Sequence, residues 1–88
     1  MMYSPKHPPK SGPSTETKAT IELIKSDLDS GITDEREAIR FYEHMVAIYG
    51  NYGWRWMFTV ILNEEREHLA KLLEAKRAVE EEERKAAV

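Results

Sequence analysis

Cysteine is absent from this sequence of 88 residues, and its absence excludes several classes of protein. Disulfide frameworks, zinc ribbons, cysteine-ligated iron sites and thiol catalysis all depend on that residue. Any metal ion that the protein binds must therefore be held by oxygen and nitrogen atoms.

Long apolar runs and basic clusters are also missing. No stretch is long enough to span a bilayer, and Met1–Pro13 lacks the apolar core of a signal peptide. Asp plus Glu number 16 against 13 Lys plus Arg, for a formal net charge of -3, which gives little support to nucleic-acid binding. We therefore expect a cytoplasmic protein with neither a membrane nor a nucleic acid among its partners.

Proline is confined to the N-terminal end, where Pro5, Pro8, Pro9 and Pro13 all lie. Such a composition cannot pack into a core, so we expect residues 1–14 to form a disordered Pro-rich tail. The remainder, 15–85, makes one small domain. A chain this short buries only a modest fraction of its surface alone, which favours a homo-oligomer, either a dimer or a ring of dimers.

The first helical segment follows from the spacing of apolar residues. Between 15 and 49 the pattern recurs every three or four residues and keeps its phase through Ile21, Ile24, Leu28, Gly31, Glu35, Ala38, Tyr42, Met45 and Tyr49. Ser30–Gly31 could interrupt the helix, with Asp34 and Glu37 forming a capping box for a second one. The unbroken phase favours one long helix, in which Gly31 would let a partner helix approach closely.

Gly50 and Gly53 punctuate the chain, and Gly50 is placed to end the first helix in a left-handed conformation. A second helix is expected over about 54–85, with its series at Trp54, Phe58, Ile61, Glu65, His68, Leu72, Ala75 and Val79. The charge run Glu80–Lys85 is expected to be a solvated helix end. Two helices with a short connection predict an all-α fold, an antiparallel two-helix hairpin.

Three polar residues interrupt the two apolar series. Glu65 and His68 are three positions apart and therefore share a helix face. Glu35 lies about 16 positions before the turn and the other two lie about 14 to 17 after it, which places all three at the same height on the hairpin. Enclosing two carboxylates and an imidazole is costly unless something binds them.

Two interpretations of this cluster are open from the residues alone. It can be a polar cluster that fixes register or oligomeric state in a non-enzymatic helical assembly module. Alternatively it is half of a metal site, because a second hairpin related by a two-fold axis would supply the same three ligands again. Four carboxylates and two imidazoles make up the ligand set of a di-iron centre in a four-helix bundle.

The local sequence also resembles a known family. The segments Asp34–Tyr42 and Glu64–His68 are similar to the half-site of the ferritin-like superfamily, as seen in rubrerythrin-type proteins. The closer similarity is to the encapsulated ferritins, which consist of one such hairpin and share the 30-residue interval between Glu35 and Glu65. The resemblance covers roughly Leu28 to Leu73.

The resemblance implies a fold and an activity. Two hairpins would dimerise into a ferritin-like four-helix bundle with a di-iron centre between the subunits, held by Glu35, Glu65 and His68 of each. The implied function is that of a ferroxidase, which oxidises Fe(II) to Fe(III) with dioxygen or peroxide for iron storage or detoxification. Metal binding and dimer formation are then expected to be a single event.

The same resemblance implies three supporting residues. Tyr42 would donate a hydrogen bond to a ligand carboxylate, and Asp34 and Glu37 would form an acidic site through which iron approaches the centre. The tryptophan found at that approach site in the family is replaced here by Phe41.

Two departures concern partners. Family members commonly end in a short apolar peptide that targets an encapsulin shell, and Lys85–Val88 shows none, so residence inside an encapsulin nanocompartment is an open expectation. Rubrerythrins add a cysteine-ligated iron domain. A rubrerythrin-like peroxide-reducing role, the remaining alternative, would therefore draw its electrons from another protein.

Overall fold

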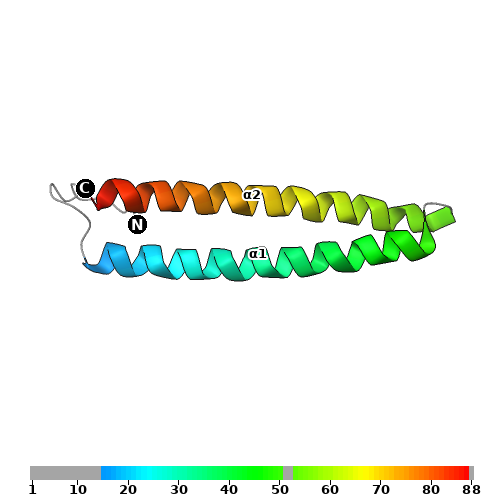
Figure 1. Ribbon diagram of the computed structural model, residues 1–88, viewed down its shortest axis with the longest axis horizontal. Helices are drawn as coiled ribbons and strands as arrows, with labels where there is room; N and C mark the ends of the chain where they lie inside the picture. Colours follow the sequence, from blue (N-terminus) through cyan, green and yellow to red (C-terminus); the bar gives the residue numbers. More distant parts are fainter. Residues whose placement is uncertain (1–14, 51–52, 88) are drawn as a thin grey trace, which may run out of the picture.

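The computed structural model describes residues 15–50 and 53–87, which form two antiparallel helices (Figure 1). Helix α1 spans Thr15–Tyr49, a short 3-10 helix spans Gly53–Arg55, and α2 spans Trp56–Ala86. The expected all-helical hairpin is confirmed for this part of the chain. The expected tail, residues 1–14, lies outside the described residues.

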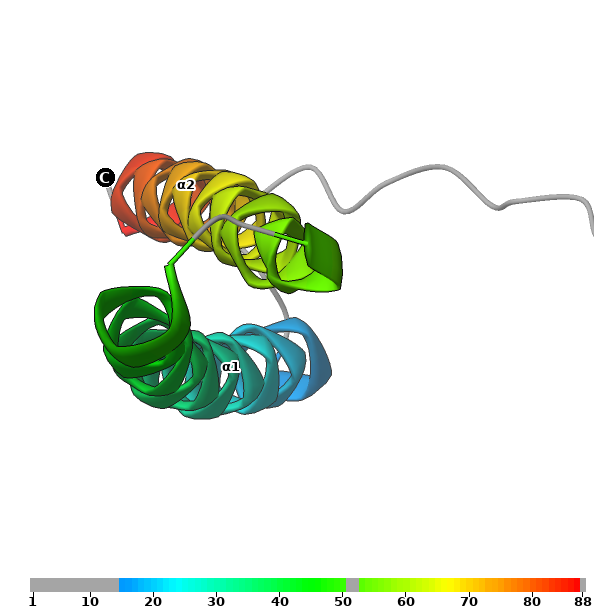
Figure 2. The same cartoon turned by 90° about the vertical axis from the view of Figure 1, so that its right-hand side faces the viewer.

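Helix α1 runs without interruption through Ser30 and Gly31, as the unbroken apolar phase predicted. Its 35 residues give a rod of about 52 Å at 1.5 Å per residue, which matches the longest dimension of the molecule, 59 Å. The end view in Figure 2 shows α1 and α2 packed side by side as a pair.

The turn combines a glycine cap with an aromatic cluster. Gly50 has a φ of 66°, the left-handed conformation expected of it, and its N–H donates to the carbonyl of Val46 at 2.8 Å. The Arg55 guanidinium lies 5.7 Å from the ring centroid of Tyr49 and 5.8 Å from that of Trp54. These cation–π contacts join Arg55 to the end of α1 and to the neighbouring Trp54.

The line of contact between the two helices differs from the predicted series by a small rotation. The positions that are less than a tenth exposed are Ile32 and Leu62, whereas the predicted series passed through their neighbours Gly31 and Ile61. The half-buried positions of α1 at the contact with α2 are Ile21, Lys25, Leu28, Glu35, Ile39, Tyr42 and Val46. Part of the predicted series therefore lies beside the contact and not in it.

The charge run at the end of α2 is also more ordered than predicted. The helix continues to Ala86, and Glu83 accepts hydrogen bonds from Lys25 Nζ at 3.0 and 3.2 Å. Lys25 and Glu83 occupy facing positions of the two contact lines, so a charged pair joins the helices where the predicted run was expected to be solvated.

Gly31 does not serve a close approach within the hairpin. A Cβ built on it would lie 3.6 Å from Leu72 Cδ1, which is ordinary van der Waals contact. We therefore expect Gly31→Ala to raise the free energy of unfolding of the metal-free protein by about 0.5–1 kcal/mol, because glycine is the poorer residue in a helix interior. Urea denaturation with a chelator present measures this. A loss of stability would show that the position is crowded in the protein in solution.

Candidate metal centre

Glu35, Glu65 and His68 converge as the spacing predicted. One ligand atom from each lies within 4.8 Å of the others, and among residues 15–50 and 53–87 this is the group of acidic and histidine side chains close enough to hold a metal ion. His68 Nδ1 is 3.9 Å from Glu35 Oε1 and 4.0 Å from Glu65 Oε1. The cluster thus joins the middle of α1 to the middle of α2.

The three side chains are enclosed unequally. The carboxylates are half-buried, with 21% and 22% of the Glu35 and Glu65 side chains exposed, whereas the His68 side chain is 56% exposed. Sequence reasoning placed all three inside the core of a pair of helices. In the single hairpin the imidazole instead lies at the edge, with one nitrogen turned toward the two carboxylates.

The Glu35 carboxylate carries the clearest sign of a missing partner. Its Oε2 atom is buried and accepts no hydrogen bond from the described residues. A buried acceptor without a donor costs free energy comparable to a lost hydrogen bond, and more when it is charged. A proton, a cation or a donor from another molecule would remove that cost.

The electrostatics of Glu35 point the same way. Its pKa is raised above the ordinary glutamate range, first because a proton on it can be shared in a hydrogen bond with Glu65. Partial burial and the negative charges of Glu65 and Asp34 raise the pKa further, and His68 partly offsets them. The site therefore favours uptake of positive charge, either as a proton or as a metal ion.

This raised pKa predicts an unusual pH dependence for the metal-free protein. A carboxyl group whose pKa is higher in the folded state than its model value of 4.5 binds its proton more tightly when folded, so its ionisation destabilises the fold. We expect Glu35→Gln to be more stable than the wild type at neutral pH. The difference should shrink as the pH falls through the folded-state pKa toward 4.5.

Chemical denaturation at several pH values in a chelating buffer measures this difference. Comparing Glu35→Gln with the wild type cancels the pH-dependent contributions of all other carboxylates to stability. One of these is Glu83, whose pKa is lowered chiefly by its hydrogen bond from Lys25. A stability difference that stayed constant with pH would contradict the assignment of the shift to Glu35.

The cluster lies toward one side of the hairpin, which we call the histidine face. It consists of residues about 80–140° round each helix from Ile32 or Leu62, in the same rotational direction, at 100° per residue. Because the helices are antiparallel, that direction leads to the same side of the hairpin from both. The residues are Thr20, Ile24, Asp27, Gly31, Ala38, Tyr42, Met45 and Tyr49 of α1 and Met57, Ile61, His68, Leu72, Ala75, Val79 and Ala86 of α2.

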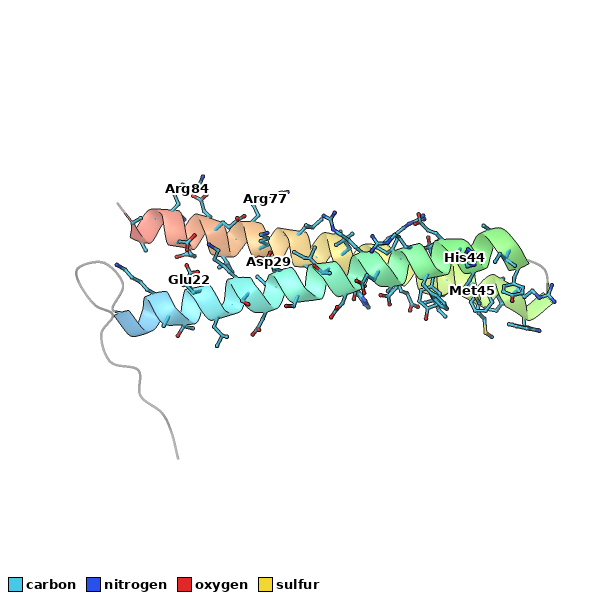
Figure 3. All side chains as sticks on the ribbon, turned by 60° about the horizontal axis from the view of Figure 1, so that its bottom comes forward. Glu22, Asp29, His44, Met45, Arg77 and Arg84 are labelled. Carbon is cyan, nitrogen blue, oxygen red and sulfur yellow. The ribbon has the colours of Figure 1, made fainter. Side chains whose placement is uncertain are left out.

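The opposite side is closed by ion pairs. Asp29 Oδ1 lies 2.6 Å from Lys76 Nζ and Glu43 Oε2 lies 3.2 Å from Arg66 Nη2. Measured from Ile32, both acidic residues are rotated about 20–60° round α1 in the direction away from the histidine face. Figure 3 shows Asp29 pointing from α1 toward α2. One side of the hairpin thus carries charges that are paired internally, while the histidine face is mainly apolar, with Thr20 and Asp27 as its polar residues outside the cluster.

The ion pairs are the feature that sequence reasoning missed. Lys25 and Lys76 fall at the helical spacing of the contact lines, and acidic residues face them across the hairpin. In the sequence, a lysine at a position of the apolar series with an acidic residue at the same height on the other helix would have indicated these ion pairs.

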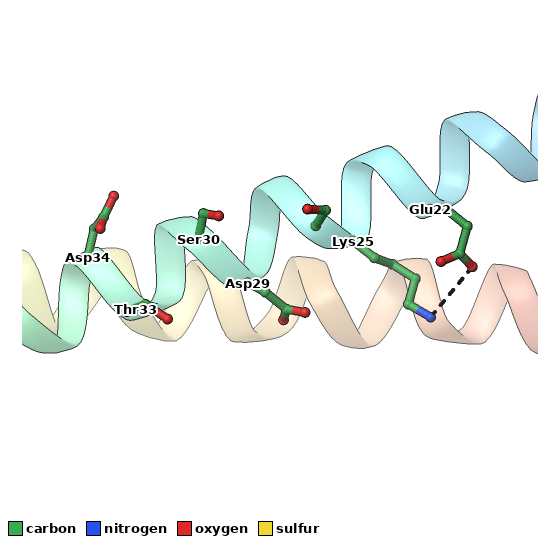
Figure 4. A pocket seen from close by; sticks show the side chains of 7 residues that line it. Glu22, Lys25, Asp29, Ser30, Thr33 and Asp34 are labelled. Atoms are coloured by element: carbon green, nitrogen blue, oxygen red, sulfur yellow. Dashed lines mark ion pairs between the residues drawn. The ribbon is translucent and has the colours of Figure 1, made fainter.

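The three supporting residues stand as follows. Tyr42 is half-buried with its ring 5.0 Å from that of Phe41, and the described residues show no hydrogen bond from it to the cluster. Asp34 and Glu37 are exposed on the outer side of α1. Figure 4 shows Asp34 in a row of polar side chains with Thr33, Ser30 and Asp29. Their roles toward iron stay predictions.

That row belongs to an open groove on α1. The groove has a volume of about 640 Å³ and is lined by Glu22, Lys25, Ser26, Asp29, Ser30, Thr33 and Asp34. Two of its charges, Lys25 and Asp29, are already paired with residues of α2. The groove does not include any member of the Glu35–Glu65–His68 cluster.

Within the described helices, none is long and apolar enough to cross a membrane. Comparisons with models of known protein families, with curated proteins and with solved structures find no match to this chain. The residues of the cluster and their surroundings are therefore the basis on which function is argued.

Proposed function

We propose that this protein is a ferroxidase that oxidises Fe(II) to Fe(III) at a di-iron site formed between two copies of the chain, for iron storage or detoxification. One observation carries the proposal. Two half-buried carboxylates and an imidazole converge on an apolar face without another element over it in the described structure, and one buried carboxylate oxygen has no donor.

The donor set suits iron. Carboxylate oxygen and imidazole nitrogen are the common ligands of non-haem iron in proteins, and the chain has no thiolate that would favour a different centre. Three ligands leave most of the coordination positions of one metal ion open. A two-fold copy would bring three more, which gives the two-glutamate, two-Glu-x-x-His set of a di-iron bundle.

The shape of the hairpin supports a second copy. Its radius of gyration is 19.2 Å, against about 12 Å for a compact domain of this length. Among the exposed large apolar side chains, Met57 (51%), Ile24 (41%) and Tyr49 (41%) lie on the histidine face, whereas Leu23, Phe41 and Ile48 lie on the outer side of α1. A four-helix bundle formed there would bury these side chains and seal the carboxylates from water.

The residues divide the work within the proposed centre. The carboxylates of Glu35 and Glu65 neutralise incoming positive charge, and their mutual repulsion in the metal-free state becomes attraction to a cation. His68 contributes Nδ1, the nitrogen that already faces both carboxylates. Iron supplies the redox chemistry, since each Fe(II) gives one electron to dioxygen or to peroxide.

The direct test is to mix metal-free protein with Fe(II) in air and to follow the absorbance of the ferric product. We expect oxidation to proceed faster than in buffer alone and to saturate near one iron per chain, because two chains share two metal positions. Iron oxidation no faster than in protein-free buffer would refute the proposal.

The oxidant separates the ferroxidase from a peroxide-reducing di-iron protein. Both use the same residues, so the rates with dioxygen and with hydrogen peroxide are compared under otherwise equal conditions. A large preference for peroxide favours the second function, which also requires an electron donor protein because this chain has no cysteine-ligated iron.

A non-enzymatic assembly module is the alternative that the raised pKa of Glu35 supports, because its first cause is a hydrogen bond with Glu65. Such a protonated pair could hold two hairpins together without metal. Chelators would then leave the mass of the assembly unchanged, and Fe(II) would bind no more tightly than to other surface carboxylates. If storage is the function, a ring, a cage or an encapsulin shell must enclose the iron, since a single bundle has no chamber for a mineral.

A further inference from the structure

We infer that one hairpin binds a single divalent cation through Glu35, Glu65 and His68 before it pairs with a second copy, so that loading precedes assembly. The inference rests on the proposed site and adds an order of events to it. It differs from the expectation drawn from the sequence, in which metal binding and pairing were one event.

The half-site is already assembled within one chain. Metal ions of this class hold oxygen and nitrogen ligands at about 2.0–2.2 Å, so neighbouring ligand atoms lie roughly 3–3.5 Å apart around the ion. The three ligand atoms of the cluster lie within 4.8 Å of one another, and two of the separations are 3.9 and 4.0 Å. Small side-chain rotations close the remaining gap without moving either helix.

The helices themselves hold the ligands in place. Glu65 and His68 are fixed relative to each other by one helical turn. Glu35 is held opposite them by the packing of the two helices, since Ile32 and Leu62 are buried within one helical turn of the cluster. A ligand set positioned by packing does not need the partner copy in order to form.

The half-site is open to solvent at His68. The two carboxylates are about four-fifths covered, whereas more than half of the His68 side chain is exposed. A cation can therefore reach the cluster from the histidine face, and water can complete its coordination there. Three protein ligands with water in the open positions is the arrangement of many accessible metal sites in proteins.

Pairing of two hairpins without metal is energetically costly. Closing the histidine face over a metal-free cluster would bury four carboxylates near the two-fold axis, with two of their oxygens already lacking donors. A cation bound first to each chain removes this repulsion. If the cation binds before the hairpins pair, the metal-free pair with its four buried carboxylates never has to form.

The test uses native mass spectrometry, which reports the number of chains and of bound ions together. Zn(II) serves as the probe because it accepts carboxylate and imidazole ligands and does not undergo oxidation. Wild-type protein is titrated from low zinc upward, beside two variants. Ile24→Glu places a charge on the histidine face about 16 Å along α1 from Glu35 and is expected to prevent pairing, and Glu65→Gln removes a ligand.

We expect a species of one chain with one zinc ion to appear at lower zinc concentration than any two-chain species. Ile24→Glu should stop at one chain with one ion, and Glu65→Gln should lose that ion in both forms. Circular dichroism checks that Ile24→Glu is helical. If it is not, wild-type protein diluted until single chains predominate provides the same measurement.

Three other outcomes are decisive. Single chains free of zinc beside zinc-loaded pairs would overturn the inference and leave the proposed di-metal site standing. Metal-free pairs that form first and take up zinc afterwards would overturn it as well. Zinc binding that is absent, or equal in wild type and Glu65→Gln, would contradict the proposed function together with the inference.

Discussion

Replacement of Glu65 by Gln is expected to abolish accelerated oxidation of Fe(II) while the hairpin stays folded. Glutamine keeps the shape of the side chain but offers a neutral amide where the site needs an anionic ligand. Loss of groups that merely support a metal ligand costs about 10- to 100-fold in affinity or activity, so loss of a ligand should cost roughly 100-fold or more. Initial rates of ferric iron formation measure the effect.

Glu64→Gln is the matched control for this prediction. Glu64 is the neighbour of Glu65, but its side chain is exposed and is not part of the cluster. The substitution therefore removes a charge of the same sign without removing a ligand. Its rate should stay close to that of the wild type. Equal loss of activity in both variants would mean that overall negative charge, and not the geometry of the cluster, drives the reaction.

The same substitution should have the opposite effect on stability. In the metal-free protein, Glu65 lies close to Glu35 and raises its pKa both by sharing a proton and by charge repulsion. Glu65→Gln removes the repulsion, so the metal-free hairpin should unfold at higher denaturant concentration. A variant that is more stable yet inactive would be typical of a site at which stability is given up for function.

Replacement of Ile24 by Glu is expected to prevent two hairpins from pairing. Ile24 is 41% exposed on the histidine face, far enough from the cluster to leave its ligands in place. Burying an unpaired carboxylate in an apolar interface costs about 3 kcal/mol or more, and the two-fold axis would place it there twice. A cost of that size weakens the dimer by roughly 100-fold or more.

Leu23→Glu provides the control, because Leu23 is 63% exposed but lies about 100° away round α1, outside the histidine face. Analytical ultracentrifugation is done with Zn(II) in place of Fe(II). It should find wild type and Leu23→Glu paired and Ile24→Glu as single chains. Pairing that survives in Ile24→Glu and fails in Leu23→Glu would place the interface on the outer side of α1. The proposed shared centre would then be wrong.

The sequence predicted the helices more accurately than it predicted which surfaces they bury. The phase of the apolar residues is a local property, so it revealed an uninterrupted α1 and the reversal at Gly50. It could not distinguish the contact between the two helices from the surface beside it. Gly31 and Ile32 are adjacent in the sequence, and only the packing of α1 against α2 shows that Ile32 is the buried one.

That rotation matters for the interpretation of the cluster. The apolar stripe of α1 is wider than one helix–helix contact requires. Such a stripe suits a helix that packs against two neighbours. In this hairpin one neighbour is the other helix, and the residues left over, from Ile24 to Tyr49 on α1, form the face on which a second copy is proposed to dock.

The sequence by itself determined the ligand types and their heights along the hairpin. The absence of cysteine excludes thiolate ligands, and the helical rise aligns Glu35 with Glu65 and His68. Only the tertiary structure decided how far each is enclosed, because enclosure depends on which side of each helix faces the other. It placed two carboxylates half-buried within one chain and left the imidazole open at the edge.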